Sequence, residues 1–144
     1  MNSLFVKILE NFNVKINAQD NYGKTSLHYA SLYHSTVSLQ VLHSHKDIKV
    51  NIQDHHGKTA LHYLVANNNI EAAQMLLAHK DINVNIQDKQ GKAPLHYASK
   101  LTHTKSLQLL LSCEDIEINM EDYEGKTPLQ YAIEYHSIAC LKHL

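Results

Sequence analysis

Two neighbouring features near residue 57 have residue types that could do chemistry, a glycine–lysine turn and a pair of histidines. Gly57-Lys58-Thr59 resembles the end of a phosphate-binding loop, and His55-His56 would offer two nitrogens to a metal ion. A phosphate-binding loop also needs a glycine five positions earlier, because its backbone amides must curl around the anion. The three Gly-Lys-Thr sequences of the chain carry Ala18, Ile52 and Met120 at that position. We therefore predict no phosphate site.

The histidine pair and the two cysteines lack the partners that a reactive site needs. Adjacent side chains such as His55 and His56 diverge, and no Cys, Asp or Glu completes a ligand set at the spacing of a zinc site. Cys113 and Cys140 make no disulfide framework, and nothing around them builds an oxyanion hole. We predict no catalytic residue, no metal and no cofactor, and hence no enzyme activity.

The composition excludes several classes of partner. The 144 residues have a net charge of −1, and all 13 cationic side chains are lysine, which argues against a nucleic-acid binder. No apolar run approaches the roughly 18 residues of a membrane span, and no ordinary signal peptide begins the chain. We expect no membrane insertion and an intracellular, cytoplasmic setting. An effector delivered into another cell by a specialised machine would have the same composition.

The elements that position these residues recur along the chain. The four glycines, Gly23, Gly57, Gly91 and Gly125, lie 34 residues apart. The segments aligned on them are DNYGKTSLHYA, DHHGKTALHYL, DKQGKAPLHYA and DYEGKTPLQYA, preceded by VKINAQD, IKVNIQD, INVNIQD and IEINMED. A period of this length is typical of stacked repeats. The glycine is best explained as the positive-φ residue of a tight turn.

Each unit contains the pattern of two short helices. Thr25, Thr59 and Thr127 can cap the first helix, whereas Ala93 loses that cap. Three residues later a side chain can reach back to the cap, and these residues are His28, His62, His96 and Gln130. A second helix follows with apolar residues at helical spacing, such as Leu107, Leu110 and Leu111. Because so short a pair cannot bury both faces alone, we expect the pairs to stack.

These motifs resemble the ankyrin repeat, whose pattern is Asp-x-x-Gly-x-Thr-Pro-Leu-His-x-Ala followed by a helix pair. The rival family of this period, the tetratricopeptide repeat, has a tryptophan-containing pattern, and this chain has no Trp. The resemblance implies an all-α fold with short β-hairpin loops, an ankyrin-repeat solenoid of four repeats plus an N-terminal half repeat. We expect one domain over residues 1–144, as a slice of a longer array or an excised domain.

The predicted repeat boundaries follow the glycine register. Residues 1–15 should form the second helix of a truncated repeat, which carries Leu4, Phe5, Ile8 and Leu9. Full repeats follow at 16–49, 50–83 and 84–117, and the last repeat spans 118–144. The glycine usual at the turn between the two helices is replaced by His34, Asn68, Thr102 and His136. Asn accepts a left-handed conformation, whereas β-branched Thr102 should force another turn shape.

The resemblance implies that a protein partner binds at the hairpin tips and the concave face of the first helices. The predicted contact residues are Tyr22, Tyr33, His55, His56, Asn67, Lys89, Gln90, Lys100, Leu101, Tyr123, Glu124 and Tyr135. Tyr is a preferred anchor because it buries a large area and keeps a polar end. A second tyrosine set recurs at the repeat period, which favours packing against neighbouring repeats over recognition; its members are Tyr29, Tyr63, Tyr97 and Tyr131.

Two interpretations of function remain open at this point. The chain is either a monomeric, non-catalytic module that binds a protein partner, or a targeting segment of a larger enzyme, channel or secreted effector whose activity lies elsewhere. Both use the same binding surface and differ only in what surrounds it. The sequence names no partner, because a fold does not determine a function.

Overall fold

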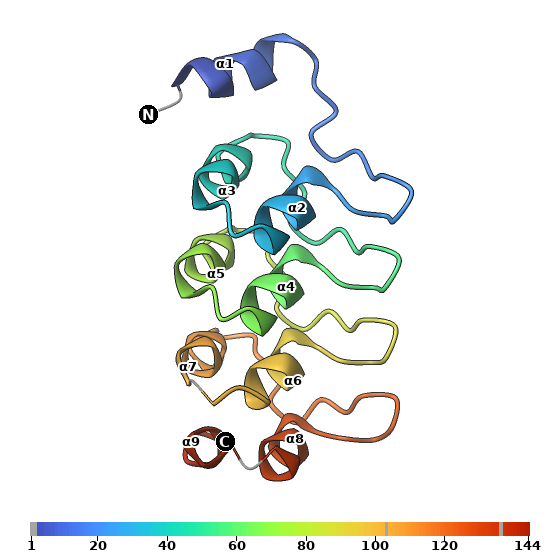
Figure 1. Ribbon diagram of the computed structural model, residues 1–144, viewed down its shortest axis with the longest axis vertical. Helices are drawn as coiled ribbons and strands as arrows, with labels where there is room; N and C mark the ends of the chain where they lie inside the picture. The colour runs from blue at the N-terminus through green and yellow to red at the C-terminus, as the bar shows by residue number, and fades with distance from the viewer. Residues whose placement is uncertain (1–2, 103, 136) are drawn as a thin grey trace.

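A computed structural model describes residues 3–102, 104–135 and 137–144, and within them the chain forms nine α-helices. Their bounds are α1 Ser3–Asn11, α2 Ser26–Leu32, α3 Thr36–His43, α4 Ala60–Ala66, α5 Ile70–Leu77, α6 Pro94–Ser99, α7 Lys105–Leu111, α8 Pro128–Glu134 and α9 Ile138–Leu141. Four helix pairs, from α2–α3 to α8–α9, are stacked along the long axis (Figure 1). This arrangement confirms the predicted solenoid.

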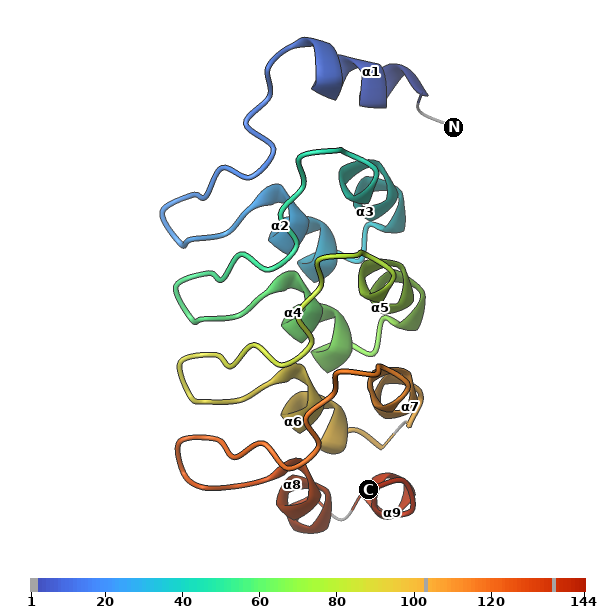
Figure 2. The same ribbon diagram turned by 180° about the vertical axis from the view of Figure 1, so that it is seen from behind.

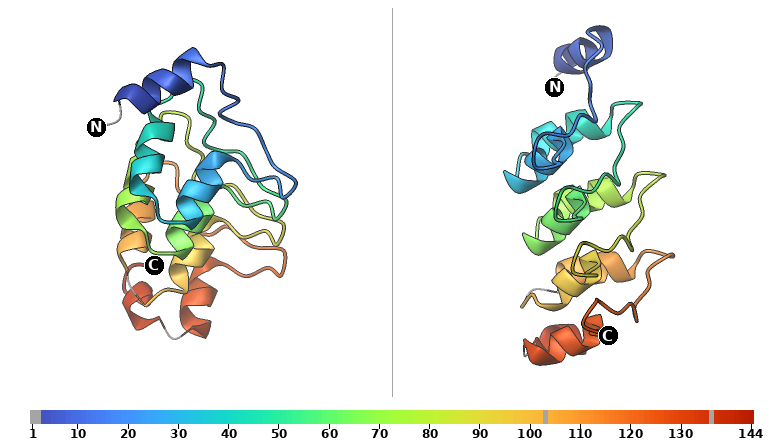
Figure 3. Two further views of the ribbon diagram at one scale, coloured as in Figure 1. Left: turned by 45° about the horizontal axis from the view of Figure 1, so that its top comes forward. Right: turned by 90° about the vertical axis from the view of Figure 1, so that its right-hand side faces the viewer.

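The helices form two layers. The first helices, α2, α4, α6 and α8, lie next to the long loops (Figure 2). The second helices, α3, α5, α7 and α9, form the other layer, on the side away from the loops. The long loops that precede the first helices all project to one side of the stack (Figure 3). One hydrophobic core runs through the whole stack, between the layers and between successive pairs, and its most completely buried residues include Leu61, Leu64, Leu95, Leu107 and Leu110. Each pair therefore depends on its neighbours for burial, as expected for stacked repeats.

The first helices begin at the predicted caps. His28 Nδ1 accepts the backbone N–H of Thr25 at 3.1 Å, and His62 Nδ1 accepts that of Thr59 at 3.0 Å. In the third repeat Ala93 has no hydroxyl, but its N–H still donates to His96 Nδ1 at 3.1 Å. Each repeated histidine thus satisfies a backbone donor that the helix itself leaves unpaired.

The loops have the shape of hairpins but contain no β-strand within the described residues. Single backbone bonds join the second loop to its neighbours, from His55 N–H to Tyr22 and from Lys89 N–H to His56. Across the loop itself, the N–H of Asp54 donates to the Lys58 carbonyl, and Asp54 Oδ1 accepts the Lys58 N–H. One such backbone pair is too few for a strand ladder, so the predicted β-hairpins are wrong in that detail. Gly57 turns the loop at φ +76°, and a Cβ there would lie 2.7 Å from the backbone nitrogen of Lys89.

The turn between paired helices has a left-handed residue in the first two repeats and another shape in the third, as expected from Thr102. His34 and Asn68 adopt left-handed φ values of 54° and 53°. In the third repeat α6 ends at Ser99, one residue earlier in register than α2, α4 and α8. The N–H of Leu101 donates to Ala98 there, three residues back, whereas Tyr33 donates four residues back to Tyr29. The repeat that contains Thr102 therefore has a different turn. The turn position His136 lies outside the described residues.

The N-terminal helix α1 lies above α3 without a first helix beside it (Figure 1). Leu4 is 70 % exposed and Ile8 39 %, whereas Leu9 packs against the core. Of the four apolar residues that the sequence places on this helix, Leu4 and Ile8 are therefore not covered by the stack, and the Phe5 side chain lies outside the described part. With α1 buried so incompletely, little free energy holds it against the stack.

Hydrogen exchange should therefore distinguish α1 from the central repeat. Amides of residues 4–11 are expected to exchange close to their unprotected rates, because an end element opens without disturbing the stack. Amides of α4 and α5 should be the slowest, since Leu61, Leu64 and Leu76 there are at most 2 % exposed. Exchange of α1 as slow as that of α4, measured by mass spectrometry of peptides, would contradict this.

Candidate partner-binding surface

One tyrosine of each repeat stands on the first helix and faces the loop. The Tyr97 hydroxyl donates to Asp88 Oδ2 at 2.5 Å, and that of Tyr131 to Asp122 Oδ2 at 2.6 Å. Tyr29 and Tyr63 bond in the same way to Asp20 and Asp54. These four bonds fix the rings against the loops.

Asp54 is held as an anion by the bonds of its own loop. Asp54 Oδ1 accepts the N–H groups of His56 and Lys58 at 2.8 and 3.0 Å, and Oδ2 accepts the Tyr63 hydroxyl. Burial alone would raise the pKa of the Asp54 carboxyl, but these bonds lower it to about 2. Burial and the bond to Asp54 raise the pKa of Tyr63, so the phenol remains a neutral donor.

Neighbouring repeats are joined through the same tyrosines. The His28 ring meets the Tyr63 ring edge-on, with centroids 6.1 Å apart, and the pair of His62 and Tyr97 repeats this at 5.9 Å. His28 Nε2 also bonds to the Lys58 carbonyl at 2.9 Å. Because Nδ1 accepts a backbone N–H, Nε2 carries the proton and donates it. The predicted packing of the repeated tyrosines against neighbouring repeats is confirmed.

Lysine side chains lie over the tyrosine rings. Lys58 Nζ lies 5.5 Å from the Tyr63 centroid and 4.9 Å from that of Tyr97. Three ammonium groups lie near the Tyr131 ring, those of Lys92 at 5.4 Å, Lys100 at 4.6 Å and Lys126 at 5.6 Å. Such contacts are attractive because the face of an aromatic ring is negative. Lys24 Nζ likewise lies 5.7 Å from the Tyr63 centroid. We use the name Tyr–Lys surface for the following residues: Tyr29, Tyr33, Tyr63, Tyr97, Tyr131 and Tyr135, with Lys24, Lys58, Lys92, Lys100 and Lys126.

The lysines of this surface differ in their charge partners. Lys24 Nζ pairs with Asp54 at 3.2 Å, and Lys126 Nζ pairs with Glu134 at 2.8 Å. Within the described residues, Lys58, Lys92 and Lys100 have no carboxylate within 4 Å. The middle of the surface therefore carries three cations without an ion-pair partner.

The predicted contact residues fall in two neighbouring places. At the end of the first helices, Tyr33 is 75 % exposed and stacks on Tyr29 with centroids 6.2 Å apart, and Tyr135 is 51 % exposed and stacks on Tyr131 at 6.3 Å. Asn67 is also exposed there, whereas Lys100 and Leu101 are half-buried. Leu101 does not occupy the same place as Tyr33, Asn67 and Tyr135, because α6 ends one residue earlier. Its carbonyl accepts the Ser137 hydroxyl at 2.6 Å.

The second group occupies the loop tips. Its members are all exposed, and they are Tyr22, His55, His56, Lys89, Gln90, Tyr123 and Glu124. Their backbones are linked from loop to loop, since His55 N–H donates to Tyr22 at 3.0 Å and Lys89 N–H donates to His56 at 3.0 Å. The side chains at the tips are thus presented by a connected backbone. Sequence reasoning missed Lys58 and Lys92, although Gly-Lys occurs in every unit.

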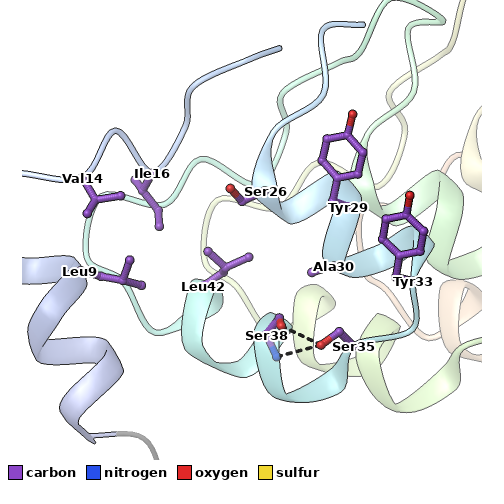
Figure 4. A pocket seen from close by; sticks show the side chains of 10 residues that line it. All are labelled: Leu9, Val14, Ile16, Ser26, Tyr29, Ala30, Tyr33, Ser35, Ser38 and Leu42. Atoms are coloured by element: carbon purple, nitrogen blue, oxygen red, sulfur yellow. Dashed lines mark hydrogen bonds between the residues drawn. The ribbon is translucent and has the colours of Figure 1, made fainter.

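A groove of about 390 Å³ opens between α1 and α2 at the N-terminal end of the Tyr–Lys surface (Figure 4). Leu9, Val14 and Leu42 form its apolar side, and Tyr29 and Tyr33 stand along its other wall. In the repeating arrangement a preceding first helix would occupy this place. Ser26 is exposed here, whereas Ala60 at the same position of the next repeat is covered by α2 and is 1 % exposed.

Two further observations concern the described residues as a whole. In them, no group of three or more His, Cys, Asp or Glu side chains gathers as metal ligands would. His55 and His56 stand on an exposed loop tip. Among the described helices, none has the length and apolar character needed to cross a membrane.

Comparison with known families explains this architecture. A family model described as ankyrin repeats in three copies matches residues 1–88, 34–122 and 81–144. The chain belongs to the ankyrin repeat family. Ankyrin repeats are generally protein–protein interaction modules, and an ankyrin repeat domain is typically non-catalytic. A comparison with curated proteins finds no match.

Proposed function

We propose that this ankyrin domain is a monomeric, non-catalytic module that binds a protein partner across the Tyr–Lys surface and the loop tips. The observation that carries the proposal is the exposure of Tyr33 and Tyr135, each stacked on a tyrosine that its own loop fixes. Rings held in this way lose little conformational entropy when a partner covers them. Exposed tyrosines on a rigid scaffold are typical anchors of protein interfaces.

The proposed setting is intracellular, in the cytoplasm. Cys113 and Cys140 are both free thiols, as expected of a protein that works in a reducing compartment. A targeting role within a larger enzyme, channel or delivered effector is the second candidate. It would use the same surface, so the same experiment tests the binding step for both.

Replacing Tyr33 or Tyr135 with alanine is expected to weaken partner binding by about 1–3 kcal/mol, because each removes one aromatic anchor. Tagged wild-type protein and the two variants would be used to capture partners from cell lysate, with quantitative mass spectrometry as the measurement. Lys105→Ala is the control, since Lys105 is exposed on α7 in the layer away from the loops. A partner retained equally by all four folded proteins would show that this surface does not bind it.

A further inference from the structure

We propose that the segment bound on the Tyr–Lys surface is acidic and extended, with carboxylates at every third residue. This inference rests on the proposed function, since it names the partner chemistry of the same surface. It begins from Lys58, Lys92 and Lys100, the three cations without an ion-pair partner in the described part of the chain. Their ammonium groups lie 4.6–5.7 Å from tyrosine centroids.

The nearby aspartates leave these cations available. Asp54 and Asp88 are 4 % and 3 % exposed, and each carboxylate already accepts two backbone N–H groups and a tyrosine hydroxyl. Their anionic oxygens therefore point into the loops. The lysine side chains are only half-buried, so their ammonium groups stay accessible to a ligand. An incoming carboxylate meets cations and phenol rings, with the aspartates behind them.

The strongest cationic position lies between the third and fourth repeats. Lys100 Nζ is within 5.7 Å of three ring centroids, those of Tyr97, Tyr131 and Tyr135. Lys92 Nζ lies over the same Tyr131 ring. A carboxylate that approaches the Tyr131 ring therefore meets two ammonium charges, and Lys92 Nζ is held there by a bond to Gln90 Oε1 at 2.9 Å. Lys58, one repeat earlier, provides the second position.

The spacing of these two positions determines the conformation of the ligand. Stacked helices lie about 8–10 Å apart. A polyproline II helix rises about 3.1 Å per residue with three residues per turn, so every third side chain projects on the same side about 9 Å further along. Carboxylates at positions i and i+3 would then reach Lys58 and the Lys92–Lys100 pair. Exposed Tyr33 and Tyr135 would pack against proline or other apolar residues on either side.

A nucleic acid is the other polyanion that such a surface could attract. The peptide is favoured because the chain has no arginine and a net charge of −1, so no long-range positive field surrounds the lysines. The cations are also confined to the middle of the surface, since Lys126 is paired with Glu134 at its C-terminal end.

The test uses the full chain and a fluorescent twelve-residue peptide with glutamate at every third position and proline at half of the others. Fluorescence anisotropy is expected to show binding that weakens about tenfold for Lys100→Gln and for Lys58→Gln, as for loss of an interfacial charge pair. Lys100→Arg should retain binding, and Lys105→Gln is the matched control. A peptide with all glutamates replaced by glutamine, or with the glutamates adjacent, should bind at least about tenfold more weakly.

Several outcomes would overturn the inference. These are absence of binding to the spaced peptide, equal binding of the glutamine peptide, equal weakening by Lys105→Gln, or tighter binding of a twelve-nucleotide single-stranded RNA. The capture experiment separates this failure from that of the proposed function. A captured partner that is lost with Tyr33→Ala but kept with Lys58→Gln and Lys100→Gln would support the proposed binding surface. It would contradict the proposal that the bound segment is acidic.

Discussion

Lowering the pH from 7 to 5 is expected to destabilise the stack through three buried histidines. His28, His62 and His96 are at most 1 % exposed, and burial lowers the pKa of each imidazole below its ordinary value of 6.5. Protonation would also place a hydrogen on Nδ1, where each ring accepts a backbone N–H. The folded chain therefore resists a proton that the unfolded chain binds.

Proton linkage gives the direction in which the free energy of unfolding changes with pH. Below pH 6.5 the unfolded chain binds more protons than the folded chain, so stability is fully present above that pH and falls as the pH is lowered. Each histidine contributes a slope of up to about 1.4 kcal/mol per pH unit. Asp54 hardly contributes in this range, since its pKa falls from an ordinary 3.8 to about 2. Urea unfolding followed by circular dichroism at pH 7, 6 and 5 measures the slope.

The fourth repeat supplies the control for this pH effect. Gln130 occupies the histidine position there, and its Oε1 accepts the Thr127 N–H at 2.7 Å. His62→Gln should therefore keep the bond to the helix cap while removing one titrating group. The slope between pH 7 and 5 is expected to fall by up to about 1.4 kcal/mol per pH unit, the contribution of one histidine. His43, whose pKa is also lowered by burial, still titrates in the variant. Equal stability of the wild-type protein at pH 7 and pH 5 would refute the histidine explanation.

Replacing Leu61 with alanine is expected to destabilise the protein by about 2–5 kcal/mol, the usual range for a buried leucine. Leu61 is 0 % exposed and lies in the core of α4, between the flanking repeats. Thermal and urea unfolding of the two proteins would measure the difference.

Leu129 is the matched control, because it holds the same position in the last repeat and is 42 % exposed. Leu129→Ala should change stability by no more than about 1 kcal/mol, because a side chain that is already largely exposed loses little burial when it is shortened. Similar losses for the two variants would mean that burial between repeats does not determine the stability of the stack.

Most of the fold could be predicted from the sequence because the repeat period reports local geometry. The glycine spacing indicates where each loop turns, and the histidine three residues after Thr25 or Thr59 indicates where a helix begins. The strands could not be excluded from the sequence, because a loop held mainly by side-chain bonds has the same residue pattern as a short hairpin. The early end of α6 depends on how the turn at Thr102 forms.

The candidate site was predictable only in part. Helical spacing correctly indicated that Tyr33 lies one turn beyond Tyr29 and that Tyr135 lies one turn beyond Tyr131. The positions of Lys58 and Lys92 over rings of the following repeats depend on how one repeat packs on the next, which local sequence does not specify. Whether these residues bind a partner stays a prediction.

The glutamine side-chain bonds that join successive loops all run in one direction, and this makes the length of the molecule adjustable. Gln19 donates to the Gln53 carbonyl, Gln53 to that of Gln87, and Gln87 to that of Glu121, at 2.9–3.0 Å. Each unit thus offers the acceptor that its predecessor needs and the donor that its successor needs. Duplication of a 34-residue unit such as 50–83 within the stack would leave every one of these bonds intact. A gene that gains or loses such a unit in register would lengthen or shorten the binding surface without altering its ends.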